Sequence, residues 1–205
     1  MKRLLVFLAA LLCSTVLSAQ QQGDTVFVNT AYCDGKPIAM TFRYTKKGSL
    51  EWITVGDGQY GSTAIDTATR ARVIVIPDSV LCPLGFRVAV TSIGRHAFGN
   101  CTHISEVRLP AGLEEIGDQA FHNCLSLAEV VMPPTLKVIW PFAFRGCHGL
   151  NIIRMLGHKR PAVYDNIFDQ QTLDNATLIV PAGYMDKYVN SLVFGMFRYC
   201  VEAFE

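Results

Sequence analysis

The chain has almost equal numbers of acidic and basic residues, so it lacks an excess of charge of either sign. Its 205 residues include 18 Lys and Arg and 17 Asp and Glu. Proteins that hold nucleic acid carry concentrated positive charge, because they must neutralise phosphates. The balanced charge therefore argues against a nucleic-acid partner.

Beyond residue 19 the chain also lacks an apolar run long enough to cross a bilayer. Residues 1–19 have a different character, because Lys2 and Arg3 precede an apolar stretch from Leu4 to Leu17. Small residues follow that stretch, as is typical of a secretory signal peptide. We therefore expect an exported protein without a transmembrane segment, located in the periplasm, at the cell surface or in the medium.

A recognisable catalytic grouping is missing as well. No serine, histidine and aspartate stand at spacings that suggest a triad, and the histidines follow no period. Catalytic and metal-binding histidines need convergent partners, so we expect these to be scattered over the surface. They are His96, His103, His122, His148 and His158. The chain is not expected to be an enzyme, and neither a catalytic residue, a metal ligand nor a cofactor is predicted.

Three glycines, Gly56, Gly58 and Gly61, match the dinucleotide-binding pattern G-x-G-x-x-G. The pattern holds a pyrophosphate only where a helix begins directly after it. Residues 62–72 show no helical apolar period. We therefore expect a glycine-rich loop here.

What the sequence does contain is a repeat of 23 residues, L-x-x-V-x-L-P-x-x-L-x-x-I-G-x-x-A-F-x-x-C. A fixed period of this length is typical of a solenoid, in which each coil buries its apolar face against its neighbours. Phe121 should fill the space between two coils. The repeated positions include Ile93, Ile116 and Ile139; Phe98, Phe121 and Phe144; and Cys101, Cys124 and Cys147.

The three cysteines of the repeat are expected to stack as a column of reduced, buried thiols, which behave as small apolar side chains. Disulfides are common in exported proteins, and three more cysteines lie outside the repeat. The sequence leaves their disulfide state open. These are Cys33, Cys82 and Cys200.

Residues 88–155 resemble the leucine-rich repeats of the BspA family, which occurs in bacterial surface proteins. The resemblance rests on Val90-Thr91-Ser92-Ile93-Gly94, on pairs such as Ala120-Phe121 and on the cysteine column. The segment Thr177–Tyr184 is similar to the cap that closes many family members, although Phe194 stands where such caps often carry tryptophan. The resemblance implies a β-rich leucine-rich repeat solenoid with short convex turns or helices, and adhesion as the role of some members.

We predict four regions: a signal peptide (1–19), an N-terminal β cap (20–72), leucine-rich repeats (73–155) and a small C-terminal α/β cap (156–205). Alternating apolar residues in Ile38–Tyr44, a turn, and Leu50–Val55 predict a β-hairpin in the first cap. In the second cap, residues 156–175 are predicted to be irregular, and a short helix is expected near Met185–Leu192.

One coil departs from the period. Pro77 and Pro110 are 33 residues apart, which predicts a ten-residue insertion around Cys82–Arg87. In the third coil Trp140 replaces a glycine that the first two coils share, Gly94 and Gly117. Those glycines should allow close packing or a positive φ.

The short strands of the repeat should present two outward columns, because side chains alternate along a strand. Exposed apolar residues beside charges suit a protein surface, so this strand face is the candidate partner-binding site. Its central residues are Glu106, Arg108, Glu129, Val131, Ile152 and Arg154, and the columns continue to Val73, Val75, Thr177 and Ile179.

These features predict a secreted or cell-surface binding module that contacts a protein, either a host matrix protein or an envelope component, through its strand face. Solenoids generally use such extended faces for recognition. The alternatives are a structural component of the cell envelope without a host ligand and an enzyme whose site lies in the N-terminal region. The sequence leaves the ligand and the oligomeric state open.

Overall fold

A computed structural model describes residues 24–68, 70, 72–164 and 166–203, so the predicted signal peptide lies outside the described residues. Most of the described elements are short strands, with a few short helices. The strands are β1 (Thr25–Cys33), β2 (Lys36–Lys47), β3 (Leu50–Val55), β4 (Val73–Val75), β5 (Ser79–Leu81), β6 (Arg87–Ile93), β7 (Glu106–Arg108), β8 (Glu115–Ile116), β9 (Glu129–Met132), β10 (Val138–Ile139), β11 (Ile152–Met155), β12 (Ala162–Val163), β13 (Thr177–Val180) and β14 (Tyr199–Glu202). The helices are α2 (Gln170–Asn175), α3 (Met185–Val189) and the 3-10 helix η1 (Phe194–Met196).

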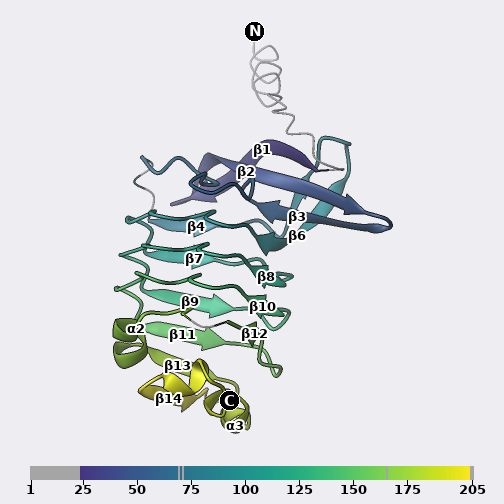
Figure 1. Cartoon of the computed structure of the whole chain (residues 1–205). Coiled ribbons are helices and arrows are strands. Elements are labelled where there is room, and N and C mark those ends of the chain that lie inside the picture. The colour runs from purple at the N-terminus through teal and green to yellow at the C-terminus, as the bar shows by residue number, and fades with distance from the viewer. Residues whose placement is uncertain (1–23, 69, 71, 165, 204–205) are drawn as a thin grey trace.

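The strands form two parallel stacks along the molecule (Figure 1). All belong to one continuous hydrogen-bonded sheet. We call the stack of β4, β7, β9, β11, β13 and β14 the first sheet and the stack of β6, β8, β10 and β12 the second sheet. The antiparallel strands β1, β2 and β3 cross the N-terminal end and join the two stacks, because β1 pairs with β4 and β3 pairs with β6. The predicted leucine-rich repeat solenoid is confirmed, but the second sheet was not predicted.

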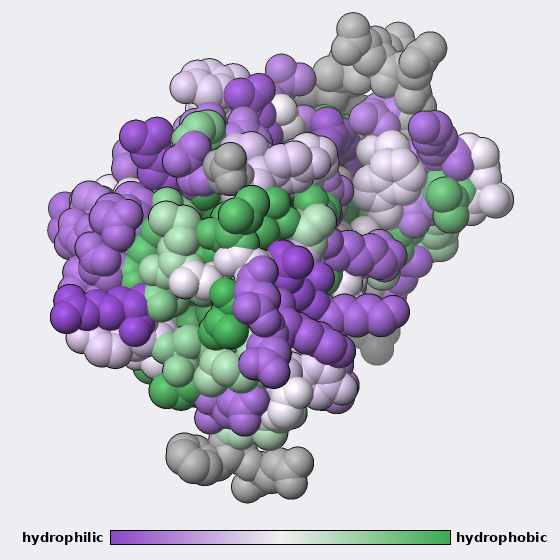
Figure 2. All heavy atoms as spheres, turned by 60° about the horizontal axis from the view of Figure 1, so that its bottom comes forward, coloured by the Kyte–Doolittle hydropathy of each residue, from purple (hydrophilic) through white to green (hydrophobic). Residues whose placement is uncertain are grey.

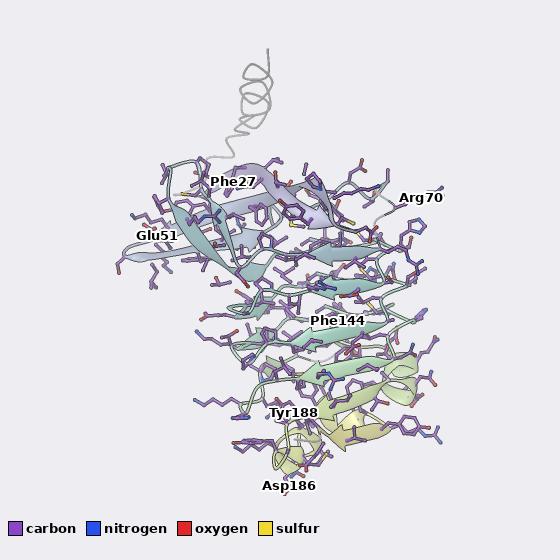
Figure 3. All side chains as sticks on the ribbon, turned by 180° about the vertical axis from the view of Figure 1, so that it is seen from behind. Phe27, Glu51, Arg70, Phe144, Asp186 and Tyr188 are labelled. Carbon is purple, nitrogen blue, oxygen red and sulfur yellow. The ribbon has the colours of Figure 1, made fainter. Side chains whose placement is uncertain are left out.

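Side chains of the same repeat position pack on one another inside the solenoid. The rings of Phe98, Phe121 and Phe144 are fully buried, and their centroids lie 5.2 and 5.1 Å apart in a nearly parallel stack. Figure 3 shows Phe144 among the coils. The predicted burial of Phe121 between two coils is therefore confirmed.

The cysteine column is buried beside the phenylalanine column, as predicted. The thiol of Cys124 donates to the Phe98 carbonyl over 3.2 Å, and that of Cys147 donates to the Phe121 carbonyl over 3.0 Å. Burial raises the pKa of the Cys101 thiol to about 12. A hydrogen bond with Cys147, followed by burial, raises the pKa of Cys124 well above its ordinary value. All six cysteines of the described residues are free.

Two positions in the turn of each coil have a positive φ. Glycine adopts this conformation freely, whereas L-residues other than Asn and Asp adopt it with difficulty. Asparagine or glycine occupies the second position, where Asn123 Nδ2 donates to Asn100 Oδ1 over 3.0 Å. These side chains form a short ladder between coils. The first position is held by His96, Gln119 and Phe142, and the second by Asn100, Asn123 and Gly146.

The repeated glycines serve close packing rather than a positive φ. A Cβ on Gly94 would lie 2.7 Å from the Val55 carbonyl oxygen, and one on Gly117 would lie 2.7 Å from that of Ile93. Neither glycine is among the positive-φ residues. The run Gly56–Gly61 forms the predicted loop, and no helix follows it in residues 62–68.

The N-terminal strands contain the predicted hairpin, with Met40, Phe42 and Tyr44 buried on one face. The prediction missed β1, which pairs with β2 along its whole length. The signal for this strand was Asp34-Gly35, the two-residue turn between Cys33 and Lys36. Such a dipeptide is typical of a tight hairpin.

The predicted insertion is a second hairpin, in which β5 pairs antiparallel with β6. The prediction that residues 156–175 are irregular is wrong, because this segment contains β12 and α2. Asp169 caps α2 by accepting a hydrogen bond from the Thr172 amide over 2.9 Å. The helix predicted near Met185–Leu192 ends at Val189, and β14 was not predicted.

The C-terminal end of the solenoid carries apolar surface. Figure 2 shows such surface in the middle of this end. Several large apolar side chains of the last elements are exposed, and Leu192 has 87% of its surface accessible. The others are Val189, Met196, Tyr199 and Val201.

Candidate functional site

The strand face has the register that the repeat predicts. Glu106 lies opposite Glu129, which lies opposite Ile152, and Val131 lies opposite Arg154. Arg108 stands in the same outward column as Val131, because Val107 pairs with Val130. Since parallel strands are about 4.8 Å apart, Arg108 and Arg154 lie roughly 10 Å apart with Val131 between them.

Each of the two arginines forms an ion pair with a glutamate of this face. Arg108 Nε lies 2.7 Å from Glu106 Oε1, and Arg154 Nε lies 3.6 Å from Glu129 Oε1. The pairs offset the repulsion between the stacked glutamates, which like charges on neighbouring strands would otherwise cause. Each guanidinium has five N–H donors, so it keeps further donors for a ligand.

A hollow of about 730 Å³ opens at the end of these strands. Apolar side chains form one side of it, and Val131 and Leu156 are 37% and 46% exposed. Pro133 and Pro134 add rigid apolar surface, while Glu106, Arg108 and Glu129 form the polar side. The combination of an apolar pocket with a charged rim is typical of a protein interface.

The sequence prediction missed Leu156 as part of this site. Leu156 follows Pro110 and Pro133 at the repeat period, so the same spacing that gave the columns could have placed it. The strand ends are recognised by proline in the other coils, and Leu156 stands where this proline is missing. Asp78 was also missed; it borders the hollow and accepts a hydrogen bond from the Ala111 amide over 2.8 Å.

The histidines are not all on the surface, so that prediction is wrong for His96. Its side chain is buried, Nε2 lies 3.0 Å from Gln119 Oε1, and the ring packs edge-on against Tyr60. Burial, followed by the charges of His96 and Arg145, lowers the pKa of the neighbouring His122. Among the described residues, no group of three or more His, Cys, Asp or Glu side chains could hold a metal ion.

Comparison with known families agrees with this architecture. The BspA type leucine-rich repeat region, in six copies, matches residues 83–194, which is more than half of the chain. The chain therefore belongs to the BspA-type leucine-rich repeat family. Members of this family are typically non-enzymatic interaction modules found at the surface or secreted.

Several solved structures are similar. A leucine-rich repeat protein from Bacteroides capillosus is 25% identical, with 69% of this chain and 94% of that one covered and a TM-score of 0.49. The leucine-rich repeat protein of T. pallidum is also 25% identical, covering 69% of this chain and 70% of that one with a TM-score of 0.49. A leucine-rich cell surface protein from Faecalibacterium prausnitzii is 17% identical, with 85% and 43% covered and a TM-score of 0.46.

No curated protein matches the chain. Within the part of the chain that the structure describes, no helix is long and apolar enough to span a membrane.

Proposed function

We propose that this protein is a secreted or cell-surface module that binds a protein partner through the strand face of its first sheet. The observation that carries the proposal is the hollow beside Val131, which combines exposed apolar surface with Arg108, while Arg154 stands in the same outward column. Arginines next to buried apolar anchors are enriched among the residues that dominate binding energy. The partner that fits is a protein segment with an apolar side chain flanked by carboxylates.

The test begins with capture of candidate partners from host matrix proteins and from envelope extracts. Each purified partner is then titrated against wild type and against the double variant Arg108→Ala, Arg154→Ala. We expect the variant to bind at least tenfold more weakly, since each lost charge-assisted contact contributes about 1.5–3 kcal/mol.

The matched control is Lys137→Ala. Lys137 pairs with Glu114 over 2.7 Å, and the pair is as exposed as Arg108 with Glu106, but it lies away from the hollow. Equal affinity of the double variant and this control for every partner would exclude the strand face as the binding site.

Export and surface location form a separate part of the proposal. The basic and apolar pattern of residues 1–19 supports export, and the Faecalibacterium protein is described as a cell surface protein. Fractionation with protease added to intact cells tests it. Digestion of the full-length protein by external protease is expected for an adhesin, whereas complete protection would favour a structural role inside the envelope.

A further inference from the structure

A second groove lies over the second sheet, and it contains both tryptophans of the chain. One hollow, of about 320 Å³, is lined by Trp52, Gly94, Gly117 and Trp140. An adjoining hollow of about 360 Å³ shares Trp52 with it, and also Ser92 and Glu115. The two hollows are therefore parts of one elongated groove.

Gly94 and Gly117 line this groove with backbone, and Trp140 follows them in the next coil. The three residues occupy the same repeat position, because each amide donates to the equivalent carbonyl of the preceding coil over 2.8–2.9 Å. At about 4.8 Å per strand, this column runs roughly 10 Å along the stack from Gly94 to Trp140.

The indole of Trp140 is held in a fixed orientation. One face stacks on Tyr164, with ring centroids 4.9 Å apart and an interplanar angle of 9°. The indole N–H donates to Glu115 Oε1, and Ser92 Oγ lies 3.5 Å from the other oxygen of that carboxylate. Tyr164 covers one face of the indole, and Trp140 lines the hollow together with Gly117.

Trp52 reaches the groove from the N-terminal strands. It lies on β3, in the β2–β3 hairpin that projects beyond the coils above the second sheet (Figure 1). Figure 3 shows its neighbour Glu51 on this projecting hairpin. Trp52 lies with Ser92 and Glu115 in both hollows. The groove thus has Trp140 in one hollow and Trp52 where the two hollows meet, with the polar groups of Ser92 and Glu115 beside them.

Three of the four carboxylates that line the groove pair with a cation, and the fourth, Glu115, accepts from the Trp140 indole while Arg43 lines the same hollow. Asp118 pairs with Arg95 over 3.0 Å, Glu114 pairs with Lys137 over 2.7 Å, and Glu51 pairs with Lys46 over 2.7 Å. Such a surface offers many hydrogen-bond donors and acceptors without a net field that would favour an ionic ligand. Flat aromatic faces add apolar contact for a ring that presents C–H groups.

We propose that this groove binds a neutral oligosaccharide. A pyranose has one face of C–H groups that stacks on an indole and equatorial hydroxyls that both donate and accept hydrogen bonds. Trp140 would stack on one sugar ring and Trp52 on another, while the Glu115 carboxylate accepts hydroxyl donors and the free N–H groups of Arg95 donate. The elongated, open groove suits an extended chain of sugars rather than a single buried one.

The test uses the exported chain on arrays of host and bacterial glycans, followed by titration of each positive oligosaccharide in solution. Both tryptophans lie in the groove, so intrinsic tryptophan fluorescence reports on the site directly. We expect a saturable change in emission and protection of the indoles from acrylamide quenching. Trp140→Ala should weaken binding roughly tenfold, as aromatic contacts of this kind allow, and Trp140→Phe should restore part of it.

Tyr199→Ala, an exposed aromatic on the strand face, is the matched control and should bind like wild type. A urea midpoint for each variant separates lost binding from lost folding, and the acrylamide measurement needs no variant at all. Absence of any glycan signal, binding that persists without Trp52 and Trp140, or a response to choline or basic peptides alone would overturn the proposal. The Arg108 and Arg154 double variant should keep its glycan binding, so this result is independent of the strand-face test.

Discussion

The phenylalanine column inside the solenoid and the arginine column on the strand face follow the same period but differ in how strictly they repeat. The interior position is phenylalanine in three successive coils, whereas the outward position is Arg108, Val131 and Arg154. The Phe121 ring stacks on the equivalent rings of the preceding and the following coil, Phe98 and Phe144. An outward side chain meets solvent, so its identity is free to vary. Recognition can therefore change from coil to coil without disturbing the stack.

The largest effect is expected from breaking the interior column. Phe121→Ala should lower the free energy of unfolding by about 3–5 kcal/mol, the usual cost of cutting a buried aromatic to alanine. Phe121 is fully buried between Phe98 and Phe144. Urea unfolding followed by circular dichroism measures the change. An unaltered midpoint would contradict the stacking described here.

A smaller loss is expected where coils approach most closely. Gly117→Ala would place a Cβ 2.7 Å from the Ile93 carbonyl oxygen. Overpacking of this kind costs about 1–3 kcal/mol. Gly112→Ala is the matched control, because its Cβ would meet nothing within 4 Å. The control should be neutral or slightly stabilising, and equal losses for the two variants would rule out the packing explanation.

Asp169 links the last regular coil to the C-terminal elements and should make stability depend on pH. Burial alone would raise its pKa, but hydrogen bonds from the Thr172 and Gly146 amides, with His148 at 3.1 Å, lower it below its usual value. A carboxyl with a lowered folded-state pKa adds stability above its unfolded pKa of about 3.9. That stability is lost as the pH falls through the folded-state pKa.

Asp169→Asn should therefore be less stable than wild type at pH 7 by about 0.5–2 kcal/mol, the range for a helix N-cap and its charge. The difference should shrink as the pH falls below about 4. Thermal unfolding of both proteins from about pH 3 to about pH 7, a range that includes the ordinary carboxyl pKa of about 3.9, measures this difference in stability. A constant difference across that range would show that the charge of Asp169 contributes nothing.

The sequence predicted the interior more fully than the surface, for a physical reason. Burial between coils imposes the same residue at Phe98, Phe121 and Phe144, so the period is visible without a structure. In the second sheet β8, β10 and β12 have only two residues each, which leaves almost no alternating pattern. The tryptophan groove also depends on Trp52, which lies on β3 outside the repeat, so the repeat spacing does not encode its proximity to the coils.

The smallest effect on stability is expected on the strand face. The double variant Arg108→Ala, Arg154→Ala removes two exposed ion pairs, each of which contributes about 0–1 kcal/mol. It also leaves Glu106 and Glu129 stacked on neighbouring strands without their cations. Like charges in this position repel, so the loss should be a few tenths of a kcal/mol at low salt.

Added salt distinguishes this repulsion from a packing defect, because it screens exposed charges within a Debye length of about 10 Å at 0.1 M. We expect the urea midpoint of the double variant to approach that of wild type as sodium chloride rises, while Lys137→Ala, which leaves no stacked glutamates, changes less. A loss above about 2 kcal/mol that salt does not relieve would mean that the arginine stems support the core. The strand face would then be part of the structural framework, and weaker partner binding by this variant could no longer be attributed to the lost contacts alone.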